Sequence, residues 1–186
     1  MEGAELRRDA ENSMKRLFLI AIVCLVVFGV RAGTLTNAPA SIELPDQFEK
    51  PQKLSFPNTN LTVLTIADRK GSEQIAGWVE PVVKRFGPQV DVRGIADVSA
   101  VPRLLRGTVR AAFRKEETHP VMMDWSGKEV AKFAPKENVT TVLLIDGQGK
   151  ILRRHEGVAK KVEVEELCKL IQEMLSKQEI KVAAKP

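Results

Sequence analysis

Strand-like and helix-like segments alternate along the chain from Leu61 onward, and this alternation constrains the fold more than any other feature. Residues 61–67 (LTVLTIA) are rich in β-branched residues and apolar on both faces, as in a central strand. The apolar residues that follow recur at helical spacing, namely Ile75, Val79, Val82, Val83 and Phe86. Gly87 and Pro88 end this helix, and residues 90–96 (VDVRGIA) return as a strand. A strand, a helix and a second strand in this order predict a parallel crossover.

The remaining segments continue the alternation and end in a hairpin. Residues 101–115 predict a second helix with Pro102 in its first turn, residues 120–124 a short strand and residues 128–133 a short helix. Residues 140–146 and 150–158 predict two antiparallel strands joined by a glycine-containing loop. Residues 162–177 predict a final helix whose apolar face consists of Val164, Leu167, Cys168, Ile171 and Leu175. The sequence therefore predicts an α/β fold: a central mixed sheet with helices on both faces and a C-terminal hairpin plus helix.

The segment before Leu61 has a different character. Residues 17–30 form an apolar run after Lys15 and Arg16, and the run is shorter than the roughly 20 residues that span a bilayer. We interpret residues 1–32 as an N-terminal extension and signal peptide, starting at Met1 or Met14; an uncleaved anchor is the alternative. Residues 33–60 contain four prolines and predict an extended lead-in with at most a short edge strand. Residues 61–178 then form the domain, and residues 179–186 a flexible basic tail.

Charge and cysteine content limit the chemistry of the exported part. Removal of residues 1–32 reduces the net charge from +5 to +4 and leaves one of the two cysteines, Cys168. An internal disulfide is then excluded, although exported proteins reach an oxidising compartment. His119 and His155 have no cysteine or histidine at metal-ligand spacing, so neither a metal nor a cofactor is predicted. Cys168 is expected to be an inert core thiol, and His155 to be exposed on its strand.

Three stretches resemble the thioredoxin-like superfamily, in particular its exported branch of redoxins, TlpA-like proteins and peroxiredoxins. Residues 61–74 (LTVLTIADRKGSEQ) resemble the first core strand and the active-site turn. Residues 119–133 (HPVMMDWSGKEVAKF) resemble the strand, turn and helix that this branch inserts. Residues 137–157 (ENVTTVLLIDGQGKILRRHEG) resemble the family hairpin GVPTTFLID-DG-I, which is the most specific of the three. The resemblance implies a thioredoxin-like fold from Leu61 to Leu175.

The same resemblance places the redox pair of the family where this chain has no cysteine. The C-x-x-C motif falls on Lys70, Gly71, Ser72 and Glu73, and none of these side chains can replace the thiolate of disulfide exchange. The cis-proline position of the family matches Thr140, where we expect a trans peptide because a non-proline cis bond costs about 3 kcal/mol. The resemblance therefore implies the fold without the activity, as in YtfJ-type proteins that lack redox cysteines.

Two basic features are candidates for binding an anion or a partner. With Ser72 as helix cap, the backbone N–H groups beside Arg69 and Lys70 could hold a carboxylate or phosphate; the alternative is a plain capped helix start. Spacings of three and four residues place four arginines in one stripe of the second helix, namely Arg103, Arg106, Arg110 and Arg114. This stripe could meet an acidic protein or an anionic membrane surface, and a solvated basic face is the alternative. Trp125 is expected to pack over the adjacent short helix.

These observations favour an exported, periplasmic or secreted, binding or assembly module that has lost the catalytic cysteines, with an unidentified protein partner in the envelope. Nucleic-acid binding is not expected, because no aromatic stacking platform accompanies the basic residues. One alternative is a thiol-dependent oxidoreductase or peroxidase-related enzyme that uses Cys168 with a partner's thiol. A second alternative is an interaction protein that residues 17–30 tether to the inner membrane.

Overall fold

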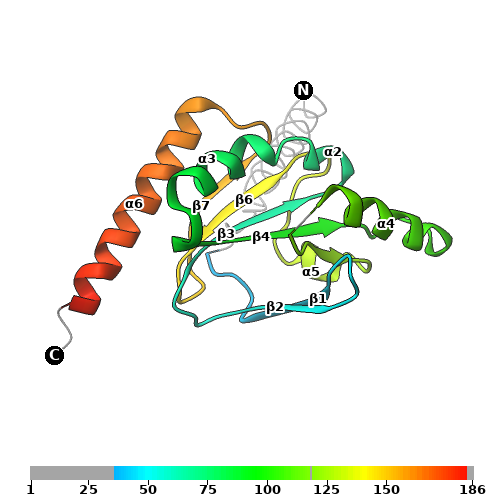
Figure 1. Ribbon diagram of the computed structural model, residues 1–186, viewed down its shortest axis with the longest axis horizontal. Helices are drawn as coiled ribbons and strands as arrows, with labels where there is room; N and C mark the ends of the chain where they lie inside the picture. Colours follow the sequence, from blue (N-terminus) through cyan, green and yellow to red (C-terminus); the bar gives the residue numbers. More distant parts are fainter. Residues whose placement is uncertain (1–35, 118, 184–186) are drawn as a thin grey trace, which may run out of the picture. The chain divides into compact units, whose positions relative to one another are not determined.

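The computed structural model describes residues 36–117 and 119–183 (Figure 1). Its strands form a five-stranded sheet in the order β5-β4-β3-β6-β7 and a separate two-stranded sheet of β1 and β2. The strands are β1 (Ser41–Pro45), β2 (Pro51–Ser55), β3 (Leu61–Ala67), β4 (Val90–Asp97), β5 (Met122–Asp124), β6 (Thr141–Ile145) and β7 (Ile151–Glu156). The helices are α2 (Arg69–Ser72), α3 (Ala76–Phe86), η1 (Gly87–Gln89), η2 (Arg103–Leu105), α4 (Arg106–Glu116), α5 (Lys128–Ala131) and α6 (Lys161–Ala183).

The five-stranded sheet is mixed, as predicted. Strand β3 pairs in parallel with β4, and β4 in parallel with β5, while β6 and β7 complete the sheet in antiparallel fashion. Every residue of β3 and of β6 is buried, which explains why their sequences are apolar on both faces. The hairpin predicted from residues 140–158 is therefore confirmed as β6 and β7.

Two apolar clusters cover the two faces of this sheet. One cluster joins the sheet to α3 and α6, and it includes Trp78, Phe86, Leu167 and Ile171. The predicted apolar face of the last helix is confirmed, because all five of its residues are buried. The face predicted for the first helix is partly wrong, since Trp78 is fully buried whereas Val83 is 48% exposed.

The second cluster contains residues of the lead-in, which was predicted to carry at most a short edge strand. Ile42 and Leu44 of β1 and Leu54 of β2 pack with Phe133 and with Leu64 of the central strand. The lead-in is thus a paired antiparallel hairpin and not a single edge strand. Alternation of apolar and polar residues in SIELP was the available signal, because Ile42 and Leu44 are buried between exposed neighbours.

Two predicted helices are interrupted in the structure. The helix after β3 divides into α2 and α3, with residues 73–75 between them. The helix predicted from residue 101 to 115 begins with η2, which Pro102 precedes, and continues as α4. In addition, no residue of α4 is buried, and Leu104 and Leu105 of η2 are exposed. Neither helix therefore makes the core contact that an amphipathic helix usually makes.

The interpretation of residues 1–32 lies outside the described residues, as do residues 184–186 of the predicted tail. Residues 179–183 of that tail continue helix α6. Among the residues that the structure describes, no helix is both long and apolar enough to cross a membrane.

Candidate functional site

Three parallel strands end in aspartates at one edge of the sheet. Asp97 is aligned with Asp124 in the register of β4 and β5. Ala67 is aligned with Ala96, which places Asp68, the next residue after β3, level with Asp97. The carboxyl ends of parallel strands are where α/β folds commonly bind ligands. This end of the sheet is therefore a candidate binding site.

Two of these aspartates hold the turns that leave the sheet. Asp68 is the N-cap of α2, since its Oδ1 accepts a hydrogen bond from the Gly71 N–H at 2.8 Å. Its Oδ2 accepts from the Asn138 N–H at 2.6 Å and so connects the turn to the loop before β6. Asp97 accepts from the N–H and the hydroxyl of Ser99, at 3.0 and 2.6 Å. Both carboxylates are therefore already engaged by their own chain.

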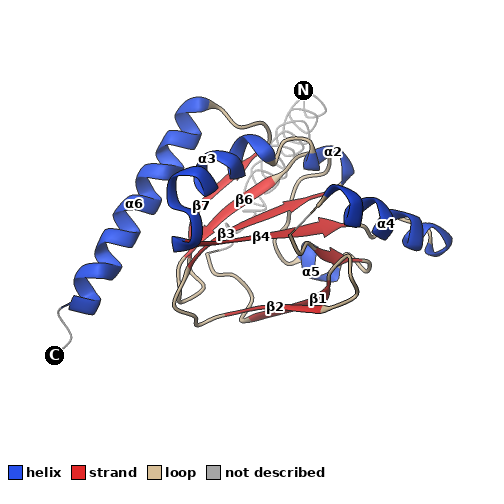
Figure 2. Ribbon diagram, in the orientation of Figure 1, coloured by secondary structure: helices blue, strands red, loops and turns tan. Residues whose placement is uncertain are grey.

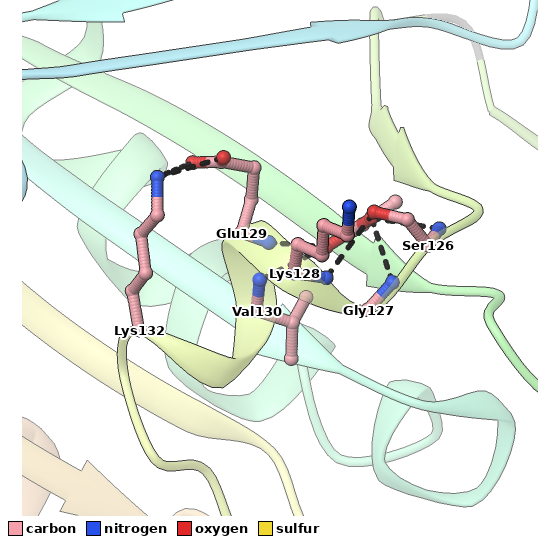
Figure 3. A network of polar contacts seen from close by, with 7 residues as sticks. Ser126, Gly127, Lys128, Glu129, Val130 and Lys132 are labelled. Atoms are coloured by element: carbon pink, nitrogen blue, oxygen red, sulfur yellow. Dashed lines mark hydrogen bonds and ion pairs between the residues drawn. The ribbon is translucent and has the colours of Figure 1, made fainter.

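Asp124 is fully buried and organises the turn between β5 and α5. Figure 3 shows residues of this turn, among them Ser126, Gly127 and Glu129. Its Oδ1 accepts from the N–H of Ser126 and of Gly127, at 3.0 and 2.9 Å, and from the Ser126 hydroxyl at 2.9 Å. Its Oδ2 accepts from the N–H of Glu129 and of Val130, at 2.8 and 3.0 Å. Burial alone would raise the pKa of Asp124, but these hydrogen bonds outweigh it and hold the pKa below its usual value.

The turn that the resemblance aligns with the C-x-x-C motif contains no cysteine. Lys70, Ser72 and Glu73 are exposed, and Gly71 is buried. The predicted cap at Ser72 is wrong: Asp68 caps α2, and the Ser72 hydroxyl donates to the Arg69 carbonyl at 2.8 Å. The competing signal was the aspartate four residues earlier, which lies directly after the strand.

Gly71 lies against the loop that carries Thr140. A Cβ at Gly71 would lie 2.7 Å from the Val139 carbonyl carbon and 3.0 Å from the Thr140 nitrogen, so the two backbones touch. The Gln74 side chain closes the contact, since its Nε2 donates to the Asn138 carbonyl and its Oε1 accepts from the Thr140 N–H, at 3.3 and 3.2 Å. Among the described residues, the cis peptide bond is Phe56–Pro57. The Val139–Thr140 peptide is trans, as predicted.

A shallow groove lies beside this contact, at the ends of β3 and β4. It has a volume of about 320 Å³ and is lined by Asp68, Asp97, Ser99, Ala100, Glu137 and Asn138. A smaller hollow of about 60 Å³ adjoins the same aspartates and extends to Val130 and Val139. The groove offers carboxylate and hydroxyl oxygens to a visiting group. Within the described residues, no group of three or more histidine, cysteine or acidic side chains is arranged to hold a metal ion.

The arginine stripe of α4 does not form the outward face that its spacing suggested. The Arg106 and Arg110 guanidinium carbons lie 5.0 and 5.1 Å from the centre of the Trp125 ring. Arg110 also forms an ion pair with Glu49 at 2.8 Å. Trp125 therefore packs against these arginines of α4 and not simply over the short helix α5.

The two ends of the stripe differ from its middle. Arg114 donates from Nε to the Gln47 carbonyl at 2.7 Å, although the residue is exposed, and Arg103 is exposed at the other end. Local spacing could place these arginines on one side of a helix. It could not show that Gln47 and Glu49, about sixty residues earlier in the chain, would meet that side.

The remaining candidates lie elsewhere. Cys168 is 1% exposed in the cluster that α3 and α6 form with the sheet, and burial raises the pKa of its thiol.

His155 is only partly exposed, contrary to prediction, because its ring packs on Trp78 with 4.8 Å between ring centres. Burial lowers the pKa of His155, and the Trp78 indole N–H donates to the Gly157 carbonyl at 2.8 Å. The alternation in β7 missed this contact because it depends on α3.

No protein-family model and no curated protein sequence matches the chain. Solved structures do match, among them a candidate thiol:disulfide interchange protein DsbE from Chlorobium tepidum, with TM-score 0.57 and 19% identity over 75% of this chain and 97% of that chain. The exposed lipoprotein thioredoxin Etrx1 from Streptococcus pneumoniae also matches, with TM-score 0.57 and 19% identity over 72% and 99% of the two chains. The thioredoxin domain of a thiol-disulfide oxidoreductase from Bacteroides vulgatus matches with TM-score 0.55 and 12% identity, over 75% and 98%. The predicted thioredoxin-like fold is thereby confirmed.

Proposed function

We propose that this protein is an exported thioredoxin-like binding module that does not exchange disulfides. One observation carries the proposal: the turn that would hold the redox pair is Lys70 to Glu73, and it contains no thiol. Disulfide exchange requires a thiolate that can reach its target. The Gly71 backbone packs directly against Val139, so the turn also leaves no space for a side chain that points inward at that position.

The remaining thiol of the exported part supports the same proposal. Cys168 is buried in the core, and its raised pKa favours the protonated, unreactive form. An enzyme that used Cys168 would have to open the packing of α6 in every turnover. A thiol-dependent oxidoreductase is therefore the outcome that the first experiment must exclude.

Export rests on the leader-like residues 1–32 and on the matched structures, one of which is described as an exposed lipoprotein. On this proposal the protein acts in the periplasm or outside the cell, and a retained anchor at residues 17–30 is the alternative. The exposed side chains of Arg69, Lys70 and Ser72 and the acidic groove beside them are the contact residues nearest to the former redox position.

A thiol assay on the folded protein tests the proposal. Cys168 should react with a disulfide reagent only after unfolding, and neither insulin-disulfide reduction nor peroxide turnover should exceed that of the Cys168→Ser variant. The control for folding is the circular dichroism of both proteins. Turnover that disappears in Cys168→Ser would show that the protein is an enzyme and would end the binding-module proposal.

A further inference from the structure

Helix α4 is held in place without burying any of its residues. Its C-terminal half is tied to the β1–β2 turn through the Arg110–Glu49 ion pair and through the hydrogen bond from Arg114 to the Gln47 carbonyl. Gln47 is itself fully buried and donates back to the Glu117 carbonyl at 3.4 Å. Trp125 supports the first turn of the helix, because its carbonyl accepts from Arg106 at 3.3 Å. These polar contacts fix α4 and leave one of its sides open.

The open side begins with two adjacent leucines. Leu104 is 96% exposed and Leu105 is 53% exposed, so Leu104 makes almost no contact with its own chain. Figure 2 shows α4 extending beyond the ends of β3 and β4, away from the sheet. Two adjacent exposed leucines at a fixed position are unusual on a surface that has no partner, because their burial would be favourable.

The chain segment that carries these leucines is basic, up to the acidic residues Asp97 and Glu116 that flank it. Residues 98–115 contain five basic and no acidic side chains, namely Arg103, Arg106, Arg110, Arg114 and Lys115. Of these, Arg110 is paired with a carboxylate in the described part of the chain. The Nε groups of Arg106 and Arg110 are buried and have no acceptor among the described residues. Those two donors face the protein, whereas Arg103 and Lys115 are exposed and form no ion pair within the described residues, so the surface has unused positive charge.

We infer that η2 and the open side of α4 form a docking surface for an acidic protein segment that carries an apolar anchor residue. The anchor covers Leu104 and Leu105, and the flanking carboxylates pair with the exposed Arg103 and Lys115. The inference rests on the proposed function, since it names the kind of partner that the binding module would take. Opposite charges around a small apolar contact provide both specificity and a fast encounter.

A protein partner fits this surface better than a lipid bilayer does. A helix that lies in a membrane interface presents bulky apolar side chains along its length. The exposed positions that follow the leucines in α4 are small, namely Gly107, Thr108, Ala111 and Ala112. Insertion would therefore bury little beyond the two leucines, whereas a protein segment can lie close along the small residues.

Peptide binding tests the inference. The probe is a fluorescein-labelled peptide of twelve residues that places two leucines among glutamates, measured by anisotropy with protein produced from the complete 186-residue sequence. Matched peptides replace the leucines with serine or the glutamates with lysine. We expect saturable binding with Kd below about 1 mM, and a loss of at least about tenfold in affinity for Leu104→Ser/Leu105→Ser and for Arg103→Glu/Lys115→Glu.

The control variant is Val158→Ser/Val162→Ser, because these valines are 68% and 69% exposed and lie outside α4. Its affinity should equal that of the unchanged protein.

Three results would overturn the inference: absence of saturation, equal binding of the lysine peptide, or undiminished binding by the leucine variant. Leucine-dependent binding to phosphatidylglycerol vesicles alone would assign the surface to a membrane, and leucine-dependent dimerisation would assign it to a second copy. Turnover that depends on Cys168 would instead end the proposed function and leave the peptide result unaffected.

Discussion

Gly71 packs against the backbone of another segment, whereas most helical residues face solvent or side chains. A Cβ at this position would lie 2.7 and 2.8 Å from the Val139 carbonyl carbon and oxygen. Alanine normally stabilises a helix relative to glycine by about 1 kcal/mol, but here it must displace the loop that carries Thr140. We therefore expect Gly71→Ala to destabilise the protein by about 1–3 kcal/mol, as overpacked cores do. Urea unfolding followed by circular dichroism measures the change.

Gly107 provides the matched control for this prediction. It is also a helical glycine, in α4, and a Cβ there would meet no atom within 4 Å. Gly107→Ala should leave stability unchanged or raise it by about 0.5–1 kcal/mol. If both alanine variants unfold at the same urea concentration, the contact between α2 and the Thr140 loop is not the reason for the glycine at position 71.

His155 makes stability depend on pH in a window of its own. Burial lowers the pKa of His155, and the negative charges of Glu163 and Glu166 offset part of this effect. In the unfolded chain the pKa of a histidine is near 6.5. There is therefore a pH range in which the unfolded chain binds a proton at His155 and the folded protein keeps the ring neutral. Because the unfolded state then holds more protons, stability should fall as the pH drops below about 6.5. His155→Phe retains a ring on Trp78 and should flatten this decline.

The measurement is the urea midpoint at pH 7.5 and at pH 5.5 for both proteins. This range lies above the region in which the carboxyl groups of Asp46, Asp124 and Glu156 take up protons, since the pKa of each is lowered. Equal pH dependence in the unchanged protein and in His155→Phe would show that the contact with Trp78 does not perturb the histidine.

At the scale of elements, α5 and the turn before it depend on one buried carboxylate. Without Asp124, the N–H groups of Gly127, Glu129 and Val130 would lose their acceptors inside the protein. We expect Asp124→Ala to cost about 3 kcal/mol, as unsatisfied buried donors do. The control is Asp146→Ala, which removes a partly exposed aspartate that accepts from the N–H groups of Gln148 and Lys150 and should cost less than about 1 kcal/mol. Similar losses in urea unfolding would contradict the role of burial.

Sequence patterns predicted the elements better than they predicted the contacts between them. Alternation and helical spacing identified the strands of the mixed sheet and the buried face of α6, because both patterns record burial along one element. They missed the stacking of Trp125 on α4, which joins segments about twenty residues apart. They also missed the packing of Gly71 on Val139, because no local property of either residue requires it. The candidate site consists mainly of such contacts, and its aspartate caps were the part within reach of local reasoning.

For the whole molecule, fold and activity follow different residues. The chain matches a solved disulfide interchange protein and a lipoprotein thioredoxin, each with TM-score 0.57 at 19% identity. It has no cysteine in the turn where the resemblance places their chemistry. The shared fold depends on buried apolar positions such as Leu64 and Leu143, which many sequences can supply.

The hairpin of β1 and β2 belongs to this core, although it precedes the segment from Leu61 that the sequence predicted as the domain. Leu54 is 3% exposed and packs in the cluster that contains Leu64 of the central strand. We expect Leu54→Ala to destabilise the whole protein by about 2–5 kcal/mol, as loss of a buried leucine does. Lys53→Ala, at an exposed position of the same strand, should change stability by less than about 0.5 kcal/mol. If the hairpin were an independent lead-in, Leu54→Ala would leave the main urea transition, monitored through the buried Trp78, unchanged.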